Sequence, residues 1–203
     1  GQTMVMSALE ISGSAADIIA VIGGGGVTLS PNVNITITGA ATTTGDLATI
    51  IAATNGAVVL NPQTIAAAYS DTAANLAAAF DGITSYAGRL SISDTGTVLA
   101  TDLTNISKLT SGTTTASTPS LVTGSSAEIV SAIGSVGLSN NVTLVISGTT
   151  AATIAELVAI NAATDKPPVL NAATIAAAYT DTAANLISAF TGTTTHTGGL
   201  TVS

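Results

Sequence analysis

Three aspartates stand at recurring turns, where their carboxylates could bind a cation. Each follows an apolar residue and a hydroxyl residue, and the three are Asp71, Asp94 and Asp181. Oxygen ligands of this kind suit Ca²⁺, so these turns are candidates for weak calcium binding. Asp71 and Asp181 also directly precede the helix-like runs "TAANLAAAF" and "TAANLISAF". We therefore predict that both cap helices, with calcium as the weaker interpretation and no other cofactor.

His196 is the only histidine of the chain, so a Ser–His–acid triad would depend on it. It lies in the loop "GTTTHTGG", and the similar loop "GITSYAGR" has Tyr86 at the same position. We predict an exposed loop residue. The run "GGGG" at 23–26 lacks the Gly-Lys-Ser/Thr of a phosphate loop and is interpreted as a connector. We predict no catalytic, cofactor-binding or firm metal site, and no enzyme.

Composition narrows the classes of partner. Charged residues make up 7% of the 203 residues, against about 25% in typical soluble proteins. The formal net charge is −8, with only three Lys and Arg, which argues against nucleic acid and anionic membranes. Mean hydropathy is +0.61, but no apolar run approaches the roughly 20 residues of a spanning helix, so we expect no membrane insertion. A surface of Thr, Ser, Asn and Gly has few charges to desolvate against a copy of itself.

The chain repeats itself at a long period. Residues 64–80 read "TIAAAYSDTAANLAAAF" and residues 174–190 read "TIAAAYTDTAANLISAF", and the echo extends over most of the sequence. We divide the chain into an N-terminal strand segment, which could pair between subunits, a first copy and a shorter second copy, at 1–12, 13–123 and 124–203. Two readings follow: a fragment of a longer array, or a subunit whose open ends are covered by its neighbours.

A shorter unit recurs inside each copy. The run "NVTLVIS" at 141–147 alternates apolar and polar residues, which is typical of a strand with one buried face. Helix starts follow, because Ser125 with Glu128 has the form of a capping box and Ser14 with Asp17 that of an acidic variant.

The helices that follow the aspartates are predicted to bury one face. Helical spacing aligns Ala73, Leu76 and Phe80, and the second copy repeats this pattern. Gly82 and Gly192 are expected to end these helices. Ahead of them, Asn61-Pro62 could cap a helix through "QTIAAAY". We favour a strand over "TIAAAYS" instead, because Tyr69 holds the position of the apolar strand residues elsewhere in the repeat.

These elements predict an α/β fold. Units of roughly 23–33 residues, each a strand, a turn, a short helix and a returning strand, are too small to bury a face alone. We expect a repeat array that forms a solenoid-like structure or a stacked, largely parallel sheet.

Several phrases resemble tandem repeats of giant bacterial surface and secreted proteins, including cyanobacterial ones. They are "SDTAANL" (70–76), "LATDLTNISKLTSGT" (99–113), "VTGSSAEI" (122–129) and "AELVAINAAT" (155–164). The resemblance covers almost the whole chain. It implies an extracellular, structural or adhesive role and carries over no catalytic residue.

The expected function is that of a non-enzymatic subunit of an extracellular filament, sheath or surface layer. The expected partner is the chain itself, head to tail, because uncharged strand edges invite pairing with another copy. The alternative is an adhesin module of a giant surface protein that binds glycans or neighbouring cells.

Overall fold

The computed structural model describes residues 4–6, 10–24 and 27–203. The chain divides into two compact units, which are described separately. Unit 1 comprises residues 1–91 with 108–113, and unit 2 comprises residues 92–107 with 114–203. The repeat boundaries predicted from the sequence stay predictions beside this division by packing. Parts of the 1–12 segment and of the "GGGG" run lie outside the described residues.

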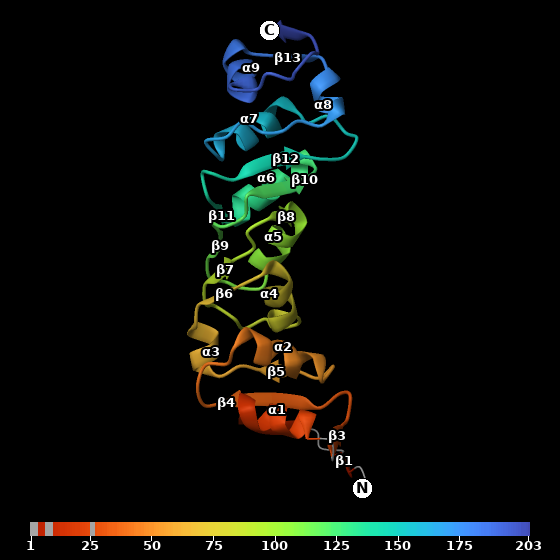
Figure 1. Cartoon of the computed structure of the whole chain (residues 1–203), viewed down its shortest axis with the longest axis vertical. Helices are drawn as coiled ribbons and strands as arrows, with labels where there is room; N and C mark the ends of the chain where they lie inside the picture. The colour runs from red at the N-terminus through yellow and green to blue at the C-terminus, as the bar shows by residue number, and fades with distance from the viewer. Residues whose placement is uncertain (1–3, 7–9, 25–26) are drawn as a thin grey trace. The chain divides into compact units, whose positions relative to one another are not determined.

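Unit 1 is built around a three-stranded parallel sheet with β4 at its centre. Its strands are β2 (Glu10–Ser14), β4 (Asn34–Thr38) and β5 (Val58–Val59). A two-stranded sheet joins β1 (Met4–Met6) and β3 (Val27–Leu29), and β6 (Tyr69–Asp71) is the edge strand next to β7 (Leu90–Ile92) in a four-stranded sheet. The helices are α1 (Ala15–Gly23), α2 (Thr44–Ala52), α3 (Pro62–Ala66) and α4 (Ala73–Phe80). In Figure 1 these elements run from red to olive.

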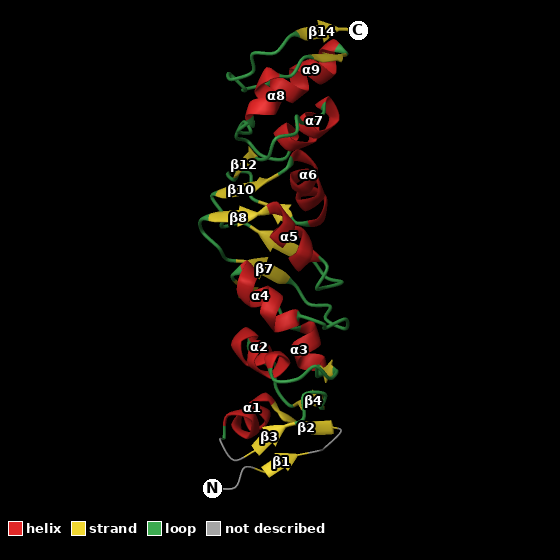
Figure 2. Cartoon of the chain, turned by 90° about the vertical axis from the view of Figure 1, so that its right-hand side faces the viewer, coloured by secondary structure: helices red, strands yellow, loops and turns green. Residues whose placement is uncertain are grey.

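Unit 2 repeats this order after an additional strand and helix. Its three-stranded parallel sheet comprises β8 (Thr97–Leu99), β10 (Leu121–Gly124) and β12 (Thr143–Ile146). The strands β9 (Thr114–Ala116) and β11 (Gly137–Leu138) pair in parallel within the four-stranded sheet, whose order is β11-β9-β7-β6, and β13 (Tyr179–Asp181) pairs with β14 (Leu200–Val202) in a two-stranded sheet. The helices are α5 (Ala100–Ser107), α6 (Ser126–Ser135), α7 (Ile154–Ala162), α8 (Ala172–Ala176) and α9 (Ala183–Phe190). Figure 2 shows α5 and α6 on one side of the three-stranded sheet.

The protein is therefore α/β with parallel sheets, as the sequence predicts, and the sheets are small and separate. Helices pack on one another along each unit: α2 contacts α4 in unit 1, and α7 contacts α9 in unit 2. Leu47, Ile50 and Leu76 are fully buried in the first of these layers. Burial of each such side chain stabilises the fold by about 1.5–3 kcal/mol. No helix in the described part of the chain is both long and apolar enough to cross a membrane.

The capping box of Ser125 and Glu128 is confirmed, and for Ser14 and Asp17 the N-cap half of the motif is confirmed. Ser125 accepts from the Glu128 amide at 3.3 Å, and the Glu128 carboxylate accepts from the Ser125 amide at 2.8 Å. Ser14 accepts from the amide of Asp17 at 3.2 Å. Because all partners lie within one helical turn, the sequence spacing alone determines these contacts.

The helix ends are also confirmed. Gly82 and Gly192 lie two residues beyond α4 and α9, with φ of +70° and +77°. This left-handed conformation closes helices and favours glycine.

The aspartates, however, are not the N-caps. The caps of α4 and α9 are Thr72 and Thr182, whose hydroxyls accept from the amides of Asn75 and Asn185. Asp71 ends β6, one residue too early for its side chain to reach that amide. Its carboxylate instead accepts from the Thr72 amide at 2.8 Å and from the Asn75 side chain at 2.7 Å.

The predicted strand over "TIAAAYS" is wrong for its first half. Asn61 caps α3 by accepting from the amide of Thr64 at 2.7 Å, and Pro62 occupies the first turn. The strand is confined to β6, which begins at Tyr69. Local capping by Asn61 therefore makes residues 62–66 helical, whereas sheet pairing makes residues 69–71 a strand.

Candidate functional site

Asp71 is held entirely by neighbouring donors. One carboxylate oxygen accepts from the hydroxyl of Thr44 at 2.6 Å, and the other accepts from Thr72 and Asn75. The hydrogen bond from Thr44 lowers the pKa of Asp71 most, partial burial opposes it, and the bonds from Asn75 and Thr72 lower it further. These contacts tie α2 and α4 to the end of β6, so Asp71 has a structural role.

Asp181 repeats only part of this arrangement. It accepts from Thr182 at 2.7 Å and from the Asn185 side chain at 2.7 Å. Ile154 stands where the first copy has Thr44, so the hydroxyl donor is missing. The structure does not bring Asp71, Asp94 and Asp181 together, and the described residues contain no group of three or more potential metal ligands. Calcium binding at any of these turns stays a prediction.

His196 is half-buried rather than exposed, which corrects the prediction from its loop. Its ring lies 4.4 Å from that of Phe190, and Nε2 lies 3.0 Å from the carbonyl oxygen of Ala177. A carbonyl only accepts, so Nε2 carries the proton and donates. In the first copy, the hydroxyl of Tyr86 donates to the carbonyl of Ala67 at 2.7 Å. The histidine thus replaces a structural tyrosine and keeps its hydrogen bond.

A polar cluster that the sequence analysis missed lies ahead of each aspartate. In unit 1, Asn61 donates to the carbonyls of Gly39 and Ala40 at 3.1 and 2.8 Å. The buried hydroxyl of Thr64 accepts from the amide of Thr42 at 3.0 Å. The hydroxyl of Tyr69 donates to the carbonyl of Thr42 at 2.6 Å. Together these side chains fix the loop between β4 and α2.

Unit 2 repeats this cluster. Asn171 donates to the carbonyl of Gly148 at 3.0 Å, Thr174 accepts from the amide of Ala152 at 2.9 Å, and Tyr179 donates to the Ala152 carbonyl at 2.7 Å. The signal in the sequence is the identical spacing of Asn, Thr and Tyr in both copies. Each of these polar groups has a structural partner.

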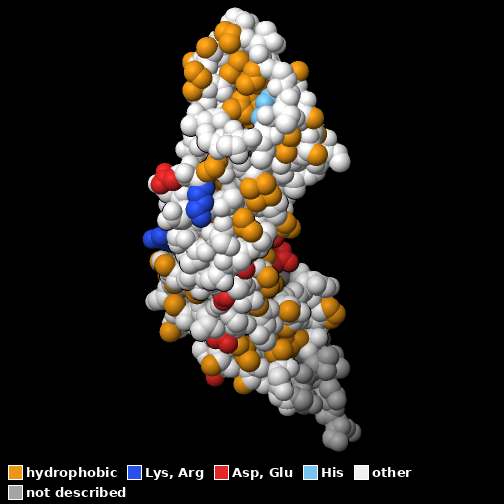
Figure 3. Space-filling model, turned by 45° about the horizontal axis from the view of Figure 1, so that its top comes forward, with side chains coloured by type: hydrophobic (Ala, Val, Ile, Leu, Met, Phe, Trp, Pro, Cys, Tyr) orange, Lys and Arg blue, Asp and Glu red, His pale blue; other side chains and the backbone are white. Residues whose placement is uncertain are grey.

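Unit 2 carries an apolar groove of about 490 Å³, which we call the unit 2 groove. Its lining is uncharged and comes from α9, from the residue after it and from β14: Ala183, Leu186, Ile187, Phe190, Thr191, Leu200 and Val202. Ile187 is 68% exposed, Val202 65% and Leu200 49%. In the view of Figure 3, the surface around the histidine (pale blue) carries hydrophobic side chains and no charged ones. Exposed apolar clusters of this kind mark interaction surfaces.

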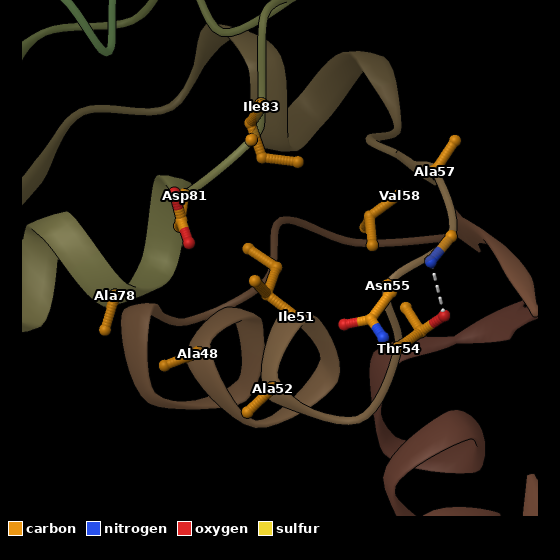
Figure 4. Close-up of a pocket in the computed structure, with 12 residues that line it drawn as sticks. Ala48, Ile51, Ala52, Thr54, Asn55, Ala57, Val58, Ala78, Asp81 and Ile83 are labelled. Atoms are coloured by element: carbon orange, nitrogen blue, oxygen red, sulfur yellow. Dashed lines mark hydrogen bonds between the residues drawn. The ribbon is translucent and has the colours of Figure 1, made fainter. Parts of the chain in front are cut away.

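Unit 1 carries a more polar hollow of about 550 Å³ between α2, the end of α4 and the chain before β5. Figure 4 shows the carboxylate of Asp81 and the amide of Asn55 on opposite sides of Ile51. Thr54 accepts from the amide of Gly56 at 2.8 Å and thereby shapes the rim. Apolar walls with a few polar groups suit a small polar ligand.

Known proteins add no further constraint. No protein-family model, curated protein or solved structure matches the chain. The candidate sites are therefore defined by their own geometry.

Proposed function

We propose that the protein is a non-enzymatic structural subunit that associates with copies of itself into an extracellular filament, sheath or surface layer. In this proposal the strand–helix units stack across subunits into a solenoid-like array. The observation that carries the proposal is the unit 2 groove, where large apolar side chains are exposed without a charge among them.

The energetics favour association at this surface. When a partner covers isoleucine, valine and leucine side chains, their apolar surface is removed from water. This burial stabilises the complex by roughly 25 cal/mol per Å² of apolar area. No charged side chain lines the groove, so this gain is not reduced by the cost of desolvating an ion. Net charge of −8 spread over the chain keeps separate subunits soluble at low concentration.

The polar residues support a structural role as well. The Asn–Thr–Tyr clusters and Asp71 are engaged with backbone or side-chain partners inside their own unit. His196 replaces a tyrosine without losing its hydrogen bond. An enzyme would need titratable groups that converge on a substrate, and these groups point instead to loops that they stabilise.

Sedimentation velocity over a hundredfold concentration range, with negative-stain electron microscopy, tests the proposal. We expect oligomers that grow with concentration and fibres or sheets on the grid. A chain that stays monodisperse and monomeric at the highest concentration contradicts it.

A second function rests on the unit 1 hollow, which favours an adhesin module that binds glycans. The amide of Asn55 and the carboxylate of Asp81 are polar groups suited to sugar hydroxyls, and Ile51 offers an apolar surface between them. A glycan array probed with the wild-type chain and with Asn55→Ala tests it. Binding that Asn55→Ala abolishes would favour the adhesin.

A further inference from the structure

The unit 2 groove has a counterpart in the first copy that is buried. Leu90 and Ile92 of β7 are 0% exposed, whereas their counterparts Leu200 and Val202 are 49% and 65% exposed. In unit 1, the segment 108–113 returns to β7, and the carbonyl of Thr113 accepts from the amide of Leu90 at 3.0 Å. The chain therefore contains its own example of how this edge is completed: by an extended segment that pairs with the strand.

The corresponding edge of β14 is open among the described residues. Tyr179 donates to the carbonyl of Gly199 at 2.9 Å, which turns the backbone groups of Gly199 toward β13. Successive residues of a strand point their N–H and C=O groups to opposite edges. The amides and carbonyls of Leu200 and Val202 therefore point away from β13, and the described residues offer no other neighbour to β14.

The repeat also identifies the segment that should pair there. Residues 113–116 lead into and form β9, and their counterparts 111 residues earlier are residues 2–5, which include most of β1 (Met4–Met6). The strand β1 runs parallel to β3, as β9 runs parallel to β11. Within the described residues, β3 is the only neighbour of β1, so its second edge is open too.

We propose that β1 of a second subunit, that is, of another molecule of the same chain, pairs in parallel with the open edge of β14 and covers the unit 2 groove. This inference rests on the proposed self-association and names the surfaces that carry it. Strand addition of this kind takes its affinity from backbone hydrogen bonds and apolar contact. The "MVM" of β1 and the groove lining are both uncharged, so the contact leaves no ion buried without a partner.

The first copy also fixes the register of this pairing. In a parallel pair an amide donates to the residue before its direct partner, as Tyr179 donates to Gly199 while lying opposite Leu200. The bond from Leu90 to Thr113 puts Leu90 opposite Thr114, and so Ser91 opposite Thr115. The equivalent register puts Thr201 opposite Met4 of the second subunit, and Val202 opposite its Val5. Directly opposed residues of neighbouring strands are within the range that a disulfide bridges.

Cysteine cross-linking tests this register, because the chain has no cysteine of its own. Two single variants, Val5→Cys and Val202→Cys, are mixed under mild oxidation and resolved on a non-reducing gel. The matched control replaces Val202→Cys by Val59→Cys, since Val59 is a 53% exposed valine on β5, an edge strand of another parallel sheet. We expect at least tenfold more mixed dimer with Val202→Cys than with Val59→Cys, and a ladder of oligomers from the Val5→Cys/Val202→Cys double variant.

The outcomes separate this inference from the proposed function. Sedimentation of the unmodified chain reports whether copies associate at all. If they associate and the two cysteine pairs cross-link equally, or not at all, self-association stands and the β1–β14 contact is overturned. A chain that stays monomeric, but binds a peptide of residues 108–116 that protects the Leu200 and Val202 amides from exchange, would also overturn the proposal. The groove would then bind such a segment rather than β1 of a second subunit. Both Val202 and Val59 are exposed, so neither variant should fail to fold.

Discussion

Replacing Asn61 by alanine should destabilise unit 1 through two separate losses. Its side-chain oxygen caps α3 at the Thr64 amide, and its side-chain nitrogen donates to the carbonyls of Gly39 and Ala40. Asn61 itself is only 5% exposed. The variant therefore loses a helix cap and the support of the loop that leads to α2.

The expected magnitude follows from these contacts. Loss of an N-cap costs about 1 kcal/mol, and a carbonyl left without its donor costs about 1–3 kcal/mol when it stays dry. Gly39 and Ala40 are themselves exposed, so water can reach their carbonyls and the lower end applies. We expect a total of about 2 kcal/mol for Asn61→Ala.

Asn61→Asp separates the two losses. Aspartate keeps the acceptor for the Thr64 amide but turns an oxygen toward the carbonyls of Gly39 and Ala40. At neutral pH we expect it to be destabilised by at least 1 kcal/mol and partly restored when its carboxyl is protonated. Urea unfolding followed by circular dichroism measures stability, and hydrogen exchange of the Thr64 amide shows whether the cap persists. The matched control is Asn171→Ala, which should cost less because Asn171 is more exposed. If Asn61→Asp is as stable as the wild type at pH 7, the donor bonds contribute nothing and the reasoning is refuted.

Three further predictions concern single positions. The pKa of Asp71 is lowered in the folded protein, chiefly by the hydrogen bond from Thr44. The stabilisation that results is complete above the pKa of the unfolded state, roughly 3.9, and is lost as pH falls through the lower pKa of the folded state. In an acid titration, Thr44→Val should therefore unfold at a higher pH than the wild type. Gly82→Ala should lose about 1 kcal/mol in thermal unfolding because φ is +70°, whereas Gly45→Ala, inside α2 with open space around it, should be neutral or stabilising. His196→Tyr should raise the melting temperature, because the larger ring should add about 1 kcal/mol of aromatic contact to the free energy of unfolding; an unchanged or lower melting temperature would contradict the structural role of the ring.

Contacts within one helical turn could be predicted from the sequence. Ser125 and Glu128 are three residues apart, and their spacing alone led to the capping box that the structure contains. The same reasoning placed the cap of α4 one residue early, at Asp71 rather than Thr72. Aspartate and threonine both cap helices well, and only the position at which β6 ends distinguishes them.

Contacts between distant segments could not be predicted. Asn61 reaches Gly39 across 22 residues, and Thr64 reaches Thr42 across the same distance. Neither residue type is unusual in a chain rich in Asn and Thr, so composition gives no signal. His196 looked exposed for a similar reason: its loop is polar, and the carbonyl of Ala177 that it contacts lies 19 residues away.

The differences between the two copies bear on what the groove is for. Within the repeated phrase the polar cluster is kept, because each of its buried groups would be left unpaired if a partner changed. One substitution in the same phrase puts Ile187 where the first copy has Ala77, and this isoleucine is 68% exposed. An exposed isoleucine adds little to the stability of unit 2 alone. Covered by another subunit, Ile187 would contribute up to about 1.5–3 kcal/mol to association. The second repeat therefore carries additional apolar surface at the position where association would use it.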